Sequence, residues 1–239
     1  SILGWTGKDK DIPGPIEVGQ DEPNESNGSD FDSELGFYLS LSQHGIDAER
    51  EAKILANALT DVLDDQDCFD IIAAAASHDI GKAHPVFQDM LTQKASEDIK
   101  QGVWAKSERS KSGKSSRPGF RHELASAIMY LQKHPGLKSI VPFLILAHHG
   151  KARTVIRSLP SEKEPDEGIR YALGVYEGDI VTLDGETHVL ELGRLMGFGR
   201  DSWVNYTSRL LKEYGPFKLA YLEALVRVAD WRASVHFYV

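Results

Sequence analysis

Several histidines and aspartates lie beside apolar segments of this sequence, and side chains of these types can bind metal ions. His78 and Asp79 follow an alanine-rich run, and His148 and His149 follow a second apolar run. A carboxylate or imidazole beside a buried helix costs free energy unless a partner compensates it, and a metal ion does so by taking both as ligands. We therefore predict that His78 and Asp79 bind metal, with the two oxygens of Asp79 able to bridge two ions.

Further side chains of metal-ligand type lie elsewhere in the chain. They are His44, His122, His148, His149 and Asp230. Taken singly, each has an ordinary explanation, since a histidine at a helix end often interacts with the helix dipole and Asp230 could pair with Arg227 or Arg232. Such explanations require a separate reason for every residue, whereas one metal centre accounts for all of them.

Other catalytic motifs are incomplete or absent. The string HELAS at His122 begins like the HExxH motif of zinc proteases, but Ser126 stands where the second histidine is required. A single cysteine, Cys68, cannot supply the cysteine pair of zinc deaminases. Glu108 occupies the upstream glycine position of a P-loop, and no GxSxG motif is present. These classes of enzyme are therefore excluded.

Composition sets broad limits on the protein. The 239 residues, 41% of them hydrophobic, suffice for one substantial helical domain or two small ones. The formal net charge of −9 counts mildly against a general nucleic-acid-binding protein, although an acidic nuclease can use metal ions and a local basic segment. No apolar stretch reaches the roughly 18 residues of a membrane span, and one cysteine permits no internal disulfide. We expect a cytoplasmic protein without membrane contact.

Hydrophobic periodicity predicts a mainly α fold with a small β-hairpin insertion. Residues 1–35 form an acidic, Gly/Pro-rich linker or packed tail, and residues 36–239 form the domain. Asp47 is a suitable N-cap for the first helix, and the alternation around Asp184–Gly185 predicts a hairpin over 180–192. The expected helices span 47–65, 67–79, 85–91, 122–133, 139–149, 201–214 and 216–236.

Basic residues are concentrated in the segment 100–121, which leads directly into His122, and again after His149. We predict that they bind a phosphate backbone, in a salt-sensitive manner. The candidates are Lys106, Arg109, Lys111, Lys114, Arg117, Arg121, Lys151 and Arg153. The alternative is a disordered, solvated loop. The two readings are compatible, because a segment that is disordered without ligand can still bind a phosphate backbone. Trp104 within this segment is expected to pack rather than to stack on bases.

The order of these residues resembles the HD nuclease domain of the CRISPR type I helicase–nuclease. The resemblance covers roughly residues 38–236 and is carried by the strings SHDIGKAHPVFQDML, RHELASA, AHHGKAR and VADWRAS. An HD pair alone occurs in many phosphohydrolases. The additional upstream histidine, the double histidine and the DWRAS string make the match much more specific.

The resemblance implies an HD-type helical bundle around two metal ions. In this reading, one ion is held by His44, His78, Asp79 and Asp230, and the second by Asp79, His122, His148 and His149. Asp79 and Lys82 are the expected catalytic residues, and Lys82 would touch the phosphate. The alternative for Lys82 is a solvated charge at a helix end.

The function implied is metal-dependent hydrolysis of single-stranded DNA in type I CRISPR interference, by two ions about 3.5–4 Å apart. A histidine-rich site favours Mn, Co, Ni or Fe over Mg. The expected partners are a superfamily 2 helicase, fused or in trans, and the CRISPR effector complex; the linker-like start favours fusion. The alternatives are an HD phosphohydrolase acting on nucleotides and a non-catalytic HD docking module.

Overall fold

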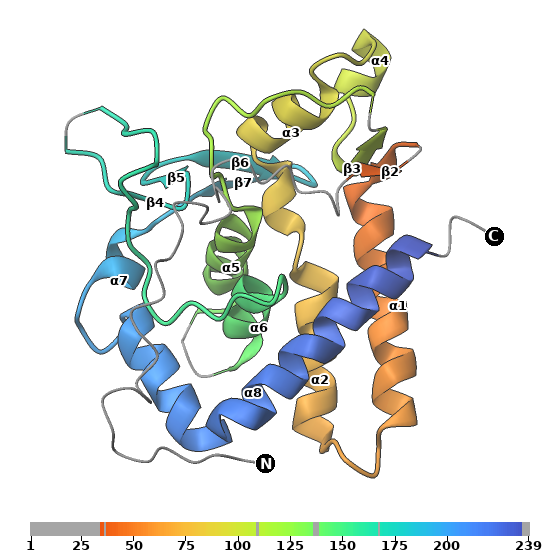
Figure 1. The fold of residues 1–239 in the computed structure, drawn as a ribbon, viewed down its shortest axis with the longest axis vertical. Coiled ribbons are helices and arrows are strands. Elements are labelled where there is room, and N and C mark those ends of the chain that lie inside the picture. Colours follow the sequence, from red (N-terminus) through yellow and green to blue (C-terminus); the bar gives the residue numbers. More distant parts are fainter. Residues whose placement is uncertain (1–33, 36, 109, 136–138, 167, 236–239) are drawn as a thin grey trace, which may run out of the picture.

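Helices form most of the structure, as predicted (Figure 1). This computed structural model describes residues 34–235 except 36, 109, 136–138 and 167, so that residues 1–33 of the predicted linker lie outside the described part. The helical elements are α1 (Leu41–Ala58), α2 (Asp65–Ser77), η4 (Ile80–Ala83), α3 (Pro85–Thr92), α4 (Glu97–Lys100), α5 (His122–Lys133), α6 (Val141–Ala147), α7 (Gly193–Met196) and α8 (Trp203–Val235).

The core is a bundle in which α1 packs on α2 and α8, while α5 packs on α6 and η4 (Figure 1). Every residue of α6 is buried, which suits a helix enclosed by its neighbours. Burying each large apolar side chain contributes about 1.5–3 kcal/mol, so packing within the bundle supplies most of the stabilisation of the described fold.

The first helix begins earlier than predicted. Ser40 is its N-cap and accepts a hydrogen bond from the backbone N–H of Gln43 at 3.2 Å. Asp47 is therefore not a cap; it lies within the helix, buried, with its Oδ1 2.8 Å from Nη1 of Arg50. The earlier start places His44 in the helix instead of before it.

The helix that precedes the HD pair ends at Ser77, two residues before its predicted end. Its start is fixed by a capping box, in which Asp64 and Asp67 each accept a hydrogen bond from the other's backbone N–H. His78 and Asp79 consequently lie in the turn between α2 and η4, where the chain changes direction and adjacent side chains can converge.

The long helix α8 is two helices joined at a bend. Gly215 has φ 71° and ψ 160°, a conformation outside the helical range, and Pro216 cannot donate a backbone hydrogen bond. The predicted helices over 201–214 and 216–236 correspond to its two halves. The second half lies beside α1 and α2 and carries Asp230 into the core (Figure 1).

A three-stranded sheet includes part of the basic segment 100–121, for which a disordered loop was the alternative expectation. Its order is β1 (Glu34–Leu35), β3 (Trp104–Glu108) and β2 (Leu39–Ser40), with β3 parallel to β1 and antiparallel to β2. The prediction of a disordered loop is wrong for 104–108, because these residues pair with two strands that are distant in sequence. Trp104 packs as expected, with its ring 5.1 Å from that of Tyr38.

The predicted hairpin is confirmed as β6 (Ile180–Leu183) and β7 (Glu186–Val189). Asp184 and Gly185 have φ of 52° and 80°, as a tight two-residue turn requires. A second hairpin, β4 (Tyr171–Ala172) with β5 (Val175–Tyr176), was not predicted. Among the residues described, no helix is both long and apolar enough to cross a membrane.

Candidate metal centre

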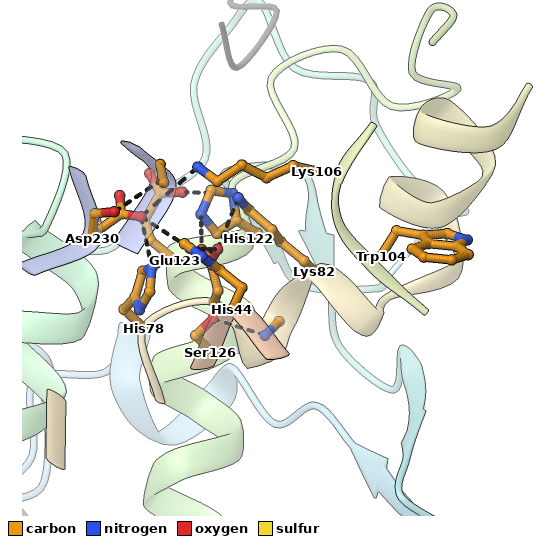
Figure 2. Close-up of polar contacts among 12 residues, drawn as sticks. His44, His78, Lys82, Trp104, Lys106, His122, Glu123, Ser126 and Asp230 are labelled. Carbon is orange, nitrogen blue, oxygen red and sulfur yellow. Dashed lines mark hydrogen bonds and ion pairs between the residues drawn. The ribbon is translucent and has the colours of Figure 1, made fainter. Parts of the chain in front are cut away.

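Three overlapping groups of metal-ligand side chains meet where α1, the α2–η4 turn, α5, α6 and α8 converge. The ligand atoms within each group lie within 4.8 Å of one another. The groups are His44–His78–Asp230, His78–Asp79–His148 and His122–His148–His149. The structure thus brings all seven predicted metal ligands together. Figure 2 shows several of them pointing toward one centre from separate elements.

The residues of the first group come from α1, from the turn between α2 and η4, and from α8. Oδ1 of Asp230 lies 2.9 Å from Nε2 of His44 and 3.6 Å from Nε2 of His78. The alternative explanation of Asp230 as an ion-pair partner of neighbouring arginines is wrong. Arg227 instead contacts Glu223, and Arg232 contacts Glu51.

Asp79 lies between the two histidine groups. Its Oδ2 is 3.3 Å from Nε2 of His44 and 3.4 Å from Nε2 of His78. Its Oδ1 is 3.2 Å from Nε2 of His122 and 3.9 Å from Nε2 of His148. Each carboxylate oxygen therefore faces a different pair of imidazoles, which is the arrangement a bridging ligand requires.

The last group is built at the end of α6. His148 is the C-cap of α6, and Nε2 of His149 lies 3.2 Å from Nε2 of His122 on α5. Gly150, with φ 77°, turns the chain directly after the pair. Its backbone N–H donates to Oε1 of Glu223 on α8 at 3.1 Å, which anchors the turn to the bundle.

Backbone carbonyls orient two of the imidazoles. Nδ1 of His78 lies 2.7 Å from the carbonyl oxygen of Ala75, and Nδ1 of His148 lies 2.7 Å from that of Ile145. A carbonyl only accepts, so each Nδ1 donates, and a neutral ring then keeps its lone pair on Nε2. Metal-binding histidines are commonly oriented in this way.

Several polar atoms of the cluster are buried and, in the described part of the chain, lie close to other charged groups of the cluster without forming a well-aligned hydrogen bond. They are Nε2 of His44, His78 and His148, both carboxylate oxygens of Asp79, and Oδ1 of Asp230. Buried polar atoms are usually satisfied, because an unpaired one costs about 1–3 kcal/mol. A set of lone pairs aimed at one another fits cations bound between them.

The protonation states of Asp79, Asp230 and His148 also suit metal binding. Burial alone would raise the pKa of the Asp79 carboxyl, but the charges of His78 and Lys82 hold it well below its usual range. Burial likewise opposes ionisation of Asp230, whose pKa is nonetheless held well below its usual range by Lys106 and His44. Burial, and then the neighbouring His149, lower the pKa of His148 well below its usual value, so this imidazole is neutral.

Lys82 faces the cluster, with Nζ 3.0 Å from Oδ2 of Asp79 and a side chain that is 2% exposed. Its alternative interpretation as a solvated helix-end charge is therefore wrong. Lys106, predicted on a basic surface segment, is equally buried, with Nζ 3.8 Å from Oδ1 of Asp230.

The other predicted substrate residues lie in different environments. Arg117 donates to both oxygens of Asp179 and covers the ring of Tyr176, 3.7 Å from its centroid, so it has a structural role. Lys114 and Lys151 are exposed, whereas Lys111, Arg121 and Arg153 are half-buried. Arg109 lies outside the described residues. A substrate role for these residues remains a prediction.

Sequence reasoning missed the residues that hold the ligands in place. A Cβ on Gly81 would lie 2.3 Å from the carbonyl oxygen of His122 and 2.4 Å from the backbone nitrogen of Ser126. Oγ of Ser126 accepts the Gly81 N–H at 2.8 Å (Figure 2). The glycine of the HDIGK string therefore allows the Asp79 turn to touch α5, a reason visible only in the fold.

A family model described as Cas3, HD domain, matches residues 26–239. The chain belongs to the Cas3 HD domain family. Cas3 HD domains are metal-dependent nucleases associated with CRISPR interference, and the buried histidine–aspartate groups found here could hold metal ions. Neither the comparison with curated proteins nor that with solved structures found a match.

Proposed function

We propose that this chain is a nuclease that hydrolyses phosphodiester bonds of single-stranded DNA in type I CRISPR interference. The observation that carries this proposal is the position of Asp79, whose two oxygens face two separate pairs of histidines. Paired sites around one bridging carboxylate are typical of two-metal phosphodiester hydrolysis. Residues 36–239 would form the nuclease domain.

The proposed ligands divide into two sets that share Asp79. His44, His78 and Asp230 complete the first set, and His122, His148 and His149 complete the second. Bound ions would activate a water and neutralise charge on the phosphate. The number of imidazoles favours Mn, Co, Ni or Fe over Mg, which prefers oxygen ligands.

The protein's own groups would orient the substrate. Lys82, with its ammonium 3.0 Å from Asp79, would contact a non-bridging oxygen of a phosphate that reaches the cluster. The burial of the ligands limits competition from bulk water and strengthens each electrostatic contact. Lys111, Lys114, Arg121, Lys151 and Arg153 would guide the strand toward the site. A superfamily 2 helicase module and the CRISPR effector complex would deliver it.

Substrate class can be tested with the metal-loaded chain and four substrates: single-stranded DNA, double-stranded DNA, a nucleoside monophosphate and a cyclic nucleotide. We expect Mn-, Co- or Ni-dependent cutting of the single strand, and poor activity with Mg alone. Preference for the small nucleotides would instead identify a nucleotide phosphohydrolase. A folded, metal-loaded chain inert to all four would identify a docking module.

A further inference from the structure

Lys106 lies inside the protein, on the central strand of the small sheet. The register pairs Leu39 with Lys106, and Ala105, Lys106 and Ser107 are all buried. An ammonium so placed is costly unless anions surround it. Its Nζ lies 3.8 Å from Oδ1 of Asp230, the carboxylate of the first ligand set (Figure 2).

The cluster thus has two buried lysines, one for each carboxylate. Lys82 stands 3.0 Å from Asp79, and Lys106 stands 3.8 Å from Asp230. Figure 2 shows both side chains reaching toward the histidines from different elements. Without metal, the two ammoniums offset the charges of Asp79 and Asp230. Glu123, with Oε2 3.8 Å from Nδ1 of His122, adds a third buried carboxylate. Divalent ions held by Asp79 and Asp230 would leave this region with excess positive charge, which an anionic phosphodiester would balance.

Gln88 on α3 connects the segments that carry the two lysines. Its Nε2 donates to the carbonyl of Lys82 at 2.6 Å and to that of Trp104 at 2.8 Å. Its Oε1 accepts the Trp104 N–H at 2.9 Å. One half-buried amide therefore fixes the start of β3 against η4. Two groups that contact one substrate must be held in a fixed position relative to each other.

On the basis of the nuclease function proposed above, we propose that Lys106 is a second substrate-contacting cation of the site. It contacts the phosphate on the Asp230 side, as Lys82 does on the Asp79 side. The carboxylates of Asp79 and Asp230 are 4% and 6% exposed and the two lysines 2%, so all four are similarly buried. The ammoniums lie 3.0 Å and 3.8 Å from these carboxylates, so a phosphate that reaches the carboxylates also comes close to both ammoniums.

The test compares the 239-residue chain with its Lys106→Met and Lys106→Arg variants and with the control Lys53→Met. Met preserves the length of the side chain without its charge. Lys53 is exposed on α1, where it pairs with Glu49. Two quantities are measured for each protein: kcat and KM on labelled single-stranded DNA with Mn²⁺, and the stoichiometry and Kd of Mn²⁺ by calorimetry.

We expect Lys106→Met to lower kcat about 100-fold, the loss typical of removing one group that stabilises developing charge. It should bind Mn²⁺ with unchanged stoichiometry and with equal or higher affinity. Lys106→Arg should retain most of the activity, and Lys53→Met should match wild type. Unchanged cleavage by Lys106→Met would overturn the inference. Parallel loss of Mn²⁺ binding, or of the fold, would also overturn it, by showing that Lys106 only holds Asp230. Failure of the wild-type chain to cut DNA would contradict the proposed function itself.

Discussion

His44 on α1 and Asp230 on α8 meet at 2.9 Å, between Nε2 and Oδ1, although they lie near opposite ends of the described chain. Neither residue stands in the HD string. They meet because α1 and the second half of α8 pack along each other beside α2. Assembly of the first ligand set therefore depends on formation of the whole bundle.

Asp230→Asn should remove one metal ion while preserving the fold. An amide of similar shape lacks the negative charge that a divalent ion requires from this position. Loss of groups that merely orient ligands costs 10–100-fold in metal affinity, so loss of a ligand should cost at least about 100-fold. Calorimetry should show stoichiometry falling from two ions to one. The control is Asp201→Asn, an exposed carboxylate that pairs with Arg194. Two ions bound to Asp230→Asn with wild-type affinity would remove Asp230 from the ligand set.

Gly81→Ala should destabilise the protein, because the added methyl group would overlap the backbone of α5 at His122 and Ser126. Overpacking of this kind costs about 1–3 kcal/mol in the free energy of unfolding. Urea denaturation measures it. Gly199→Ala is the matched control, since a Cβ there meets no atom within 4 Å. Equal stability of the two variants would show that the η4 turn moves away from α5 at no cost.

Glu223 should act as a positioning residue for His148 and His149, through its hydrogen bond to Gly150. Glu223→Ala should weaken Mn²⁺ binding by about 10-fold. Glu223→Gln keeps an acceptor oxygen and should restore most of the affinity. Glu213→Ala, exposed on the same helix, serves as the control. Should the Ala variant bind Mn²⁺ like wild type, the turn after α6 needs no anchor.

Asp179 should stabilise the fold in a pH-dependent way. Burial alone would raise its pKa, but hydrogen bonds from His84 and Arg117 outweigh burial and lower the pKa from 3.8 to about 2. The ionised form is therefore favoured by folding. Its contribution, about 2 kcal/mol, is complete above pH 3.8 and is lost as the pH falls toward 2.

This pH dependence can be measured by urea denaturation at a series of pH values. Asp179→Asn should be less stable at pH 6 and should lose less stability than wild type between pH 4 and pH 2. The exposed Asp89→Asn should follow the wild-type curve. Parallel curves for Asp179→Asn and wild type would show that Asp179 contributes nothing to acid stability.

The helical elements could be predicted because their apolar periods and caps are local signals. The Pro85 start, the Asp184–Gly185 turn and the break at Gly215–Pro216 each depend on a few adjacent residues. The proposed metal ligands could be predicted as a combination, because five imidazoles and two carboxylates beside apolar segments need a common explanation. The resemblance to HD nucleases divided them into two sets.

The remaining features depend on contacts that are distant in sequence. The strand at Lys106 forms by pairing with residues near Leu39, and its composition gives no alternation to detect. Lysine and arginine in a Ser/Gly-rich segment predict a surface, yet Lys106 is buried and Arg117 is paired with Asp179. The Ser40–Gln43 spacing, which fits a capping-box pattern, was a missed local signal for the true start of α1.

Asp79 is proposed to bridge two metal ions that together cut single-stranded DNA. The most direct measurement is cleavage of end-labelled single-stranded DNA by wild type and Asp79→Ala, with Mn, Co, Ni, Mg or chelator. We predict cutting by wild type with Mn, Co or Ni, little with Mg alone, and none with chelator or in the variant. Cleavage that persists in Asp79→Ala or in chelator, or no cleavage by folded, metal-loaded wild type, would contradict the claim.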